Sequence, residues 1–177
     1  MTIPQQPISQ AQPLSKDLSG KQAVIDALPD HPAVKALLAW NAGAVTDAKV
    51  AFAELTLTVT PEEIRGACNA LKAVGYNFFE DMTAVDWFPA SPRFQLSYHL
   101  LSHAMLDRVR LRVMLEADDP SIDSIVPLWA GADFYEREVF DLFGIRFAGH
   151  PDLRRILLPD DWKGHPLRKD YPVEGYR

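Results

Sequence analysis

The chain has 177 residues, of which 47% are hydrophobic and 24% charged, as in folded globular proteins. This length supports one domain with a real core, and the composition excludes wholesale disorder. The formal net charge of −6 argues against a chain-wide nucleic-acid surface, which needs a concentrated positive field. The single cysteine, Cys68, excludes an internal disulfide and an iron–sulfur cluster ligated only by cysteines of this chain.

Composition divides the chain into three zones. Residues 1–28 are rich in Pro, Gln and Ser and are expected to form a flexible N-terminal arm without signal-peptide character. Residues 29–145 alternate helical and strand patterns and are expected to form the domain. Residues 146–177 contain four prolines, which predict an extended tail because each proline lacks a backbone donor and restricts its predecessor. No run reaches the ~20 apolar residues that a membrane span needs.

The first elements are a helix and a strand. Asp30 is expected near the N-cap of a short helix, with Pro32 near its first position. Residues 52–60 alternate in part between apolar and polar side chains, which predicts a half-buried strand.

A second helix is predicted immediately after that strand. Thr60, Pro61 and Glu63 have the spacing of an N-cap, a first-turn proline and a capping box. The apolar stripe of this helix includes Cys68, which we interpret as a buried apolar residue rather than a reactive thiol, and Gly75 ends it.

Three strands follow, at residues 78–87, 93–102 and 108–116. The third alternates regularly and places Arg108, Arg110 and Arg112 in a row on one face. This basic row has two interpretations, a solvated face or a docking surface for an acidic partner.

Helical patterns at residues 122–128 and 134–143 complete the domain, the second ended by Gly144. The order of elements predicts an α+β fold: a two-layer domain with a mixed or antiparallel sheet covered by helices, plus an extended Pro-rich C-terminal tail.

Common catalytic and cofactor motifs are absent from the sequence, including Gly-rich nucleotide loops, C-x-x-C, H-E-x-x-H and G-x-S-x-G. The loop that holds His150, Asp152, Asp161 and His165 could fold around a divalent ion. Structural anchoring is the preferred interpretation, because the spacing matches no known ligand frame. We therefore expect no metal, flavin or cluster bound by this chain.

The segment from Phe134 to Pro172 carries the most information. From Arg146 to Arg177 the chain has seven basic and five acidic residues, net +2, so the preceding 145 residues carry −8. Arg, Trp and Tyr are enriched at interface hot spots, and proline-stiffened chain loses little entropy on binding. The tail is therefore predicted to wrap over a partner protein. Within the preceding helix, Arg137 and Asp141 are spaced to form an i, i+4 ion pair.

This segment resembles the signature of the C subunit of respiratory NADH:quinone oxidoreductase (complex I), in its bacterial form. The resemblance covers roughly residues 30–177. The matching motifs are Glu136-Arg137-Glu138, Asp141 to Gly144, Gly149-His150-Pro151, Leu153, Arg155-Ile156-Leu157, Pro159, and Gly164 to Tyr171.

The resemblance implies a core peripheral-arm subunit that scaffolds the quinone-proximal D and B subunits, near the cluster-bearing peripheral subunits. It implies that FMN and the clusters lie in other subunits, and that the chain meets the cytoplasmic side of the inner membrane only through the complex. The implied interface residues are Glu136, Arg137, Glu138, Asp141, Phe143, Gly144, His150, Pro151, Arg154, Arg155, Pro159, Trp162, Gly164, His165, Pro166, Arg168, Lys169, Asp170 and Tyr171.

Two rival classes stand beside this one. A free-standing enzyme would use carboxylates such as Glu136, Glu138 and Asp141 for acid–base chemistry. Glu136 and Glu138 diverge by about 200° on a helix, however, so they cannot share a substrate. A generic binding module for an acidic partner would occur without the other complex I subunits.

Overall fold

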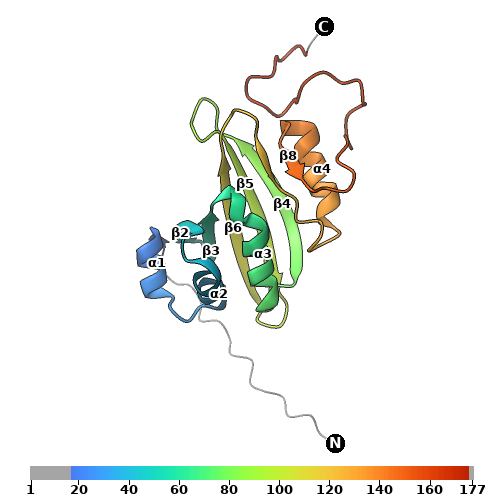
Figure 1. Cartoon of the computed structure of the whole chain (residues 1–177). Helices are drawn as coiled ribbons and strands as arrows, with labels where there is room; N and C mark the ends of the chain where they lie inside the picture. The colour runs from blue at the N-terminus through green and yellow to red at the C-terminus, as the bar shows by residue number, and fades with distance from the viewer. Residues whose placement is uncertain (1–16, 176–177) are drawn as a thin grey trace, which may run out of the picture.

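The computed structural model of the chain describes residues 17–175, and the expected arm at residues 1–16 lies outside them (Figure 1). The elements are β1 (Leu18–Ser19), α1 (Lys21–Ala27), α2 (Pro32–Asn41), β2 (Val45–Ala51), β3 (Glu54–Val59), the single 3₁₀ turn η1 (Pro61–Glu63), α3 (Ile64–Ala73), β4 (Phe78–Asp86), β5 (Phe94–Ser102), β6 (Asp107–Leu115), β7 (Ser121–Asp123), α4 (Ala132–Phe143) and β8 (Arg146–Ala148).

Six strands form the main sheet in the order β1-β2-β3-β6-β5-β4. Neighbours run antiparallel except β3 and β6, which are parallel, with Leu57 opposite Leu111. The parallel pair needs a crossover, which the chain makes through α3 and the β4–β5 hairpin. The sheet is therefore mixed, and the predicted α+β class is confirmed.

The core lies between one face of the sheet and the helices. Alternation in β6 buries Val109, Leu111 and Val113 on this face, as the sequence predicts. Helix α3 covers the same face, with Cys68 fully buried in its apolar stripe. Burial raises the pKa of the Cys68 thiol, consistent with an inert packing residue.

Three local expectations are wrong, and each is overridden by a contact distant in sequence. Residues 18–27, expected within the flexible arm, form β1 and α1, because Leu18 pairs with Val50 and Val24 is buried. The domain also reaches past residue 145. Strand β8 pairs in parallel with β7, so residues 122–128 do not form the expected helix.

The helix caps also differ from the expected ones. His31, rather than Asp30, caps α2 and accepts a hydrogen bond from the Ala33 N–H. The side chain of Thr60 makes no cap hydrogen bond, and the Glu63 carboxylate accepts instead from the Asn41 amide at 3.1 Å. The capping-box pattern therefore marks where the helical segment begins, but its bonds are not formed.

After β8 the described part of the tail, residues 149–175, contains turns but no helix or strand. Figure 1 shows the tail running around α4 and beyond the end of the sheet. The tail thus covers the side of the domain on which α4 lies.

Candidate partner-binding site

The site is formed by α4 and the tail, and its centre is the buried carboxylate of Asp141. One oxygen accepts from the Arg155 guanidinium at 2.6 Å. The other accepts three consecutive tail N–H groups, those of Ile156, Leu157 and Leu158, at 2.8–3.0 Å. Both oxygens of this α4 carboxylate are thus used to hold one turn of the tail.

Burial opposes the charge on Asp141, but the three N–H groups and Arg155 more than compensate and lower its pKa. The carboxyl is fully buried and the Arg155 side chain only 15% exposed. The pair is therefore a charge-assisted internal bond rather than a surface ion pair.

Arg155 connects three parts of the tail to the helix. Besides the carboxylate, it donates to the backbone carbonyl of Asp141 and to the carbonyls of Trp162 and Gly164, at 3.0–3.1 Å. A planar guanidinium offers five donors in fixed directions, which suits it to several acceptors at once. The loop from Arg155 to Gly164 is closed around this side chain.

Gly144 and His165 fix the point where the tail returns to α4. Gly144 ends the helix in the left-handed conformation, φ 75°, as the sequence predicts. A Cβ atom at this position would lie 2.6 Å from the His165 ring. The Nδ1 atom of His165 is 2.9 Å from the Asp141 carbonyl oxygen, which identifies Nδ1 as the donor. Only glycine permits this close approach.

A second anchor holds the end of the tail to the sheet. Arg93, directly before β5, contacts Asp86 of the domain and Asp170 of the tail, each at 2.7 Å. Asp86 also accepts the backbone N–H of Lys169 at 2.8 Å. Arg93 holds the pKa of both carboxyls below their usual range.

The sequence pattern does not identify Arg93 and Asp86 as site residues. Each is a charged residue at the end of a predicted strand, and charged residues are common at exposed strand ends, so the pattern does not mark them.

Arg137 does not form the ion pair with Asp141 that its spacing suggests. It donates to the carbonyls of Arg154 and Arg155, at 3.2 and 3.1 Å, and lies 3.9 Å from Asp133. The Asp141 carboxylate instead binds Arg155 and backbone N–H groups of the tail. Like the carboxylate, Arg137 therefore binds tail backbone.

Histidine 150 is buried against the same helix. Its Nε2 atom lies 3.1 Å from Asp133, while its Nδ1 atom accepts the N–H of Asp152 at 3.0 Å. In the part of the chain that the structure describes, no group of three or more His, Cys, Asp or Glu side chains could hold a metal ion. Both His150 and His165 thus anchor turns of the tail.

Glu136 lies on the opposite, inward side of α4 and is fully buried. It accepts the N–H of Ile125 at 2.7 Å, and its second oxygen has no hydrogen-bond partner among the described residues. Burial raises its pKa to about 7, an effect that the neighbouring Ser124 and Ile125 only partly offset. The neighbouring Tyr98 hydroxyl is likewise buried without a partner in the described structure.

The remaining signature residues divide between buried contacts and the outer surface. Phe143 packs in the core, and Arg168 lies over the Phe94 ring at 5.1 Å. Glu138 and Arg154 are exposed. Pro151, Pro159, Trp162, Pro166, Lys169 and Tyr171 lie along the tail, each exposed or half-buried.

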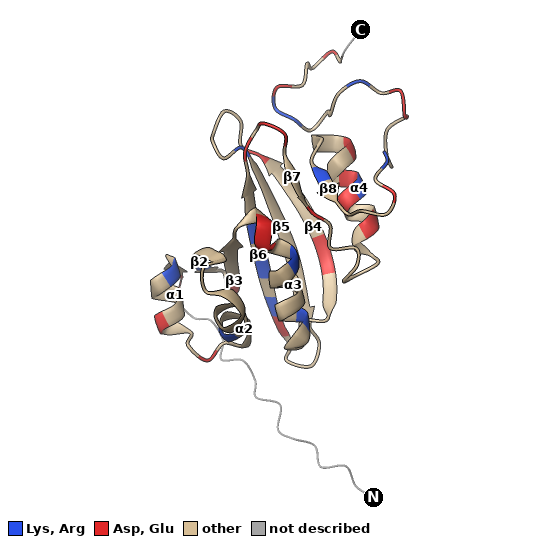
Figure 2. Cartoon of the chain, in the orientation of Figure 1, with Lys and Arg blue, Asp and Glu red and all other residues tan. Residues whose placement is uncertain are grey.

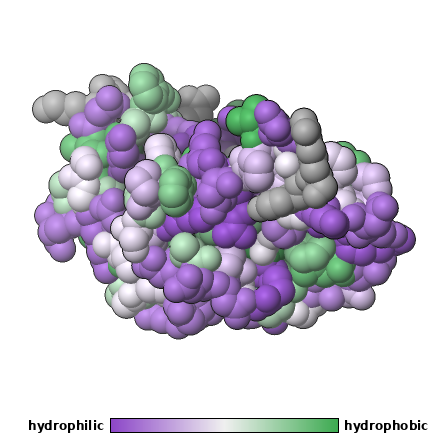
Figure 3. Space-filling model, turned by 90° about the horizontal axis from the view of Figure 1, so that it is seen from above, coloured by the Kyte–Doolittle hydropathy of each residue, from purple (hydrophilic) through white to green (hydrophobic). Residues whose placement is uncertain are grey.

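The outer surface of the tail carries large apolar side chains. Leu157, Leu167 and Val173 are 62%, 49% and 105% exposed. Acidic and basic residues are interleaved along α4 and the tail (Figure 2), and from above apolar side chains are scattered among hydrophilic ones (Figure 3). The polar groups hold the tail in place, while these three apolar side chains face water, as expected of a partner-binding segment.

The fold and the anchored tail are those expected of a subunit that binds partner proteins, and proteins of similar sequence are subunits of a respiratory enzyme. The family model described as respiratory-chain NADH dehydrogenase, 30 kDa subunit, matches residues 57–177, so the chain belongs to this family. It is 48% identical over 135 residues to the C subunit of the NADH-quinone oxidoreductase of Citrifermentans bemidjiense, covering 76% of this chain and 84% of that relative. It is 44% identical over 151 residues to the C subunit of the same oxidoreductase in Roseiflexus castenholzii, covering 81% and 85%.

Two solved structures share this fold. A trypsin-resistant fragment of Nqo5 matches with a TM-score of 0.62 and 31% identity, covering 70% of this chain and all of that one. A chain of the membrane-bound sulfane sulfur reductase, an archaeal respiratory membrane complex, matches with a TM-score of 0.67 and 25% identity, covering 78% and 82%. Within the described residues, no helix is long and apolar enough to cross a membrane.

Proposed function

We propose that this chain is a non-catalytic core subunit of the peripheral arm of a proton-translocating NADH:quinone oxidoreductase. In this role it scaffolds the D and B subunits near the quinone and lies beside the cluster-bearing peripheral subunits. NADH oxidation and quinone reduction then belong to the whole complex, with FMN and the clusters in other chains. The complex would hold the chain at the cytoplasmic side of the inner membrane.

The orientation of the tail is the observation that carries this proposal. Asp141 and Arg93 hold its backbone and charged groups inward. Leu157 and Leu167 are left on the outside, although exposing large apolar side chains on an anchored segment is unfavourable in water. A partner surface that covers them removes this penalty.

The carboxylates favour scaffolding over a free-standing enzyme. Glu136 and Asp141 are both fully buried, on different sides of α4, and each already accepts backbone N–H groups. Glu138 is exposed but stands apart from both. General acid–base catalysis needs a group within hydrogen-bond reach of a substrate, and neither buried carboxylate offers that access.

The double variant Leu157→Ser, Leu167→Ser tests the proposal in membranes of a host that lacks its own copy. We expect the assembled complex to fall several-fold while the melting temperature of the isolated chain barely changes, because both side chains are exposed. Leu106→Ser is the matched control, since Leu106 is 82% exposed in the turn between β5 and β6.

The amount of assembled complex and the NADH:quinone activity are measured on the same membranes. A normal amount of assembled complex with normal activity would show that Leu157 and Leu167 do not lie at a partner interface. Normal assembly with reduced activity would contradict the purely scaffolding role, because the tail would then act in turnover.

A further inference from the structure

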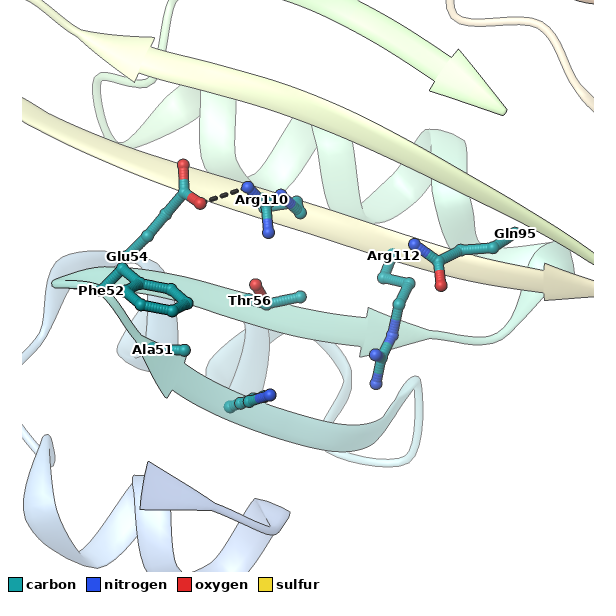
Figure 4. A pocket seen from close by; sticks show the side chains of 8 residues that line it. Ala51, Phe52, Glu54, Thr56, Gln95, Arg110 and Arg112 are labelled. Carbon is teal, nitrogen blue, oxygen red and sulfur yellow. Dashed lines mark hydrogen bonds and ion pairs between the residues drawn. The ribbon is translucent and has the colours of Figure 1, made fainter. Parts of the chain in front are cut away.

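The face of the main sheet opposite α3 is lined by polar side chains and holds a groove of about 230 Å³ (Figure 4). The groove crosses β2, β3, β6 and β5, whereas the tail packs around α4 beside β4. It is therefore separate from the tail surface. The residues that shape it include Lys49, Phe52, Glu54, Thr56, Arg110 and Arg112.

The floor of the groove has an excess of positive charge. Three of its lining side chains are cationic, and Glu54 is the one lining carboxylate. Arg110 is bound to Glu54 and to His99 Nε2, the latter at 2.7 Å. Arg112 donates to Thr58 Oγ1 at 2.9 Å and to Asp47 at 3.1 Å.

These contacts hold the two guanidinium groups in place. Each has further N–H donors, since a guanidinium carries five. Lys49 is exposed at the groove and has no ion pair within residues 17–175. Three cations against Glu54 and Asp47, which pair with Arg110 and Arg112, leave a net charge of +1 at the groove, opposite in sign to the −6 of the whole chain.

Phe52 forms an aromatic wall at the end of the groove. It is 95% exposed and occupies the turn between β2 and β3, where Phe52 and Ala53 have φ values of 53° and 60°. Such turns normally use Asn or Gly, because positive φ is unfavourable for residues with a Cβ atom. The Phe52 N–H donates to Asp17 at 3.2 Å, which helps to hold the turn.

The turn therefore combines backbone strain with a large apolar side chain in water. Strained backbone of this kind clusters at functional sites, and exposed aromatic side chains act as interface anchors. Neither feature contributes to the core of this domain.

We propose that the groove binds an acidic segment of a partner protein. A carboxylate of that segment is held by Lys49 and the free donors of Arg110 and Arg112, and a neighbouring apolar residue packs on Phe52. Guanidinium groups fixed in place are suited to carboxylates, because their donors match two oxygens at once. Residues 1–16 of this chain do not complement the groove, since they contain Lys16 and no Asp or Glu.

The experiment replaces Phe52 with photoreactive p-benzoylphenylalanine in the full chain, expressed in a host without its own copy. Intact cells are irradiated, and the cross-linked peptide is identified by mass spectrometry. We expect a peptide of another protein with Asp or Glu within a few residues of the attachment point. Because the cross-link forms at the groove itself, the result does not depend on whether the tail binds the D and B subunits.

Lys49→Glu, combined with the same photoreactive residue, tests whether the positive charge of Lys49 is needed to bind the partner. Lys49 is exposed, so the fold is unaffected, and we expect the cross-link yield to fall at least tenfold. Lys35→Glu is the control, because Lys35 is 62% exposed on α2, away from the groove.

Three outcomes would overturn the proposal. These are absence of a protein cross-link, attachment to residues 1–16 or to lipid, and a partner cross-link whose yield Lys49→Glu leaves unchanged.

Discussion

Asp141 shows how one side chain can organise a segment that has no regular secondary structure. Its carboxylate accepts four hydrogen bonds from the tail, one from Arg155 and three from consecutive backbone N–H groups. Buried backbone donors need such partners, and a tail without helix or strand has no ladder to supply them. The sequence identified Asp141 as a signature residue but suggested the wrong partner, because i, i+4 spacing is visible in a sequence and a tail contact is not.

Asp141→Asn is expected to lower the free energy of unfolding by about 3 kcal/mol at neutral pH, since it leaves the largely buried Arg155 without its counter-charge. The pKa of Asp141 is lowered in the folded chain, so its stabilising effect is present above the unfolded value of about 3.9 and is lost as pH falls through the folded value. Urea titrations at neutral and acidic pH measure both effects, and the difference from wild type should shrink in acid.

Asp152→Asn is the control for this variant. Asp152 pairs with Arg154, but both side chains are more than 60% exposed, at 63% and 66%. Exposed pairs contribute about 0–1 kcal/mol. Equal losses from the two variants would show that the Asp141 network does not hold the tail.

The raised pKa of Glu136 predicts a pH dependence of folding stability opposite in sign to that of Asp141. The pKa of Glu136 is raised to about 7 in the folded chain, so folding takes up a proton between the unfolded value of about 4.3 and about 7. Stability is therefore lost as pH rises through this window. Glu136→Gln should become more stable relative to wild type by roughly 1.4 kcal/mol per pH unit there, and then level off.

Denaturant titrations across this pH range check the prediction, with Glu138→Gln as control. Glu138 is two positions away on α4 and exposed. If the two variants show the same pH profile, Glu136 is not the titrating group.

At the scale of elements, the sequence predicted those whose pattern is local. Strands β5 and β6 and helices α3 and α4 are predicted because apolar residues recur along each with a regular period, whereas β4 is predicted from an apolar run without a regular period. Strands β1, β7 and β8 are two or three residues long, too short for a period to emerge. Residues 121–123 extend only because Arg146–Ala148 pairs with them, a contact distant in sequence.

The candidate site was predicted in the same partial way. The motif identified residues of α4 and the tail, but not how they meet. The contacts of Asp86 and Arg93 with the end of the tail join positions more than 70 residues apart and leave no periodic trace.

Gly144→Ala tests the junction between α4 and the tail. A left-handed residue with a Cβ atom is disfavoured by about 1–2 kcal/mol, and this Cβ would lie 2.6 Å from the His165 ring. The ring must then move and lose its bond to the Asp141 carbonyl. We expect faster hydrogen exchange in residues 164–168 and faster tryptic cleavage at Lys163 and Arg168.

Gly131→Ala is the matched glycine control at the other end of α4. Gly131 has φ −65°, and a Cβ atom there would meet nothing within 4 Å. Its exchange and cleavage rates should stay at wild-type values. Unchanged rates in Gly144→Ala as well would contradict the close approach of His165.

At the scale of the whole molecule, the domain and the tail are stabilised in different ways. All residues of the buried apolar cluster in the described structure lie at or before Phe147, and Leu153 alone packs against it from the tail. The tail is held mainly by charged and backbone hydrogen bonds.

Deletion of residues 149–177 should therefore leave a chain that still unfolds cooperatively, with a lower melting temperature, because the core remains intact. The same deletion should abolish incorporation into the membrane complex. Thermal circular dichroism of the purified chain and the amount of the chain retained in membranes measure the two effects. A non-cooperative melt would show that the tail belongs to the folding core, and normal incorporation would show that it is dispensable for assembly.

The position of the anchoring groups along the chain has a consequence for biosynthesis. Asp86, Arg93 and Asp141 belong to the domain, whereas the groups that complete their hydrogen bonds lie at residues 155–170. A ribosome releases the domain first, so the domain folds while these charges are still hydrated and unpaired. Docking of the tail then follows folding of the domain. The apolar face offered to a partner is presented only after residues 155–170 have left the ribosome and docked.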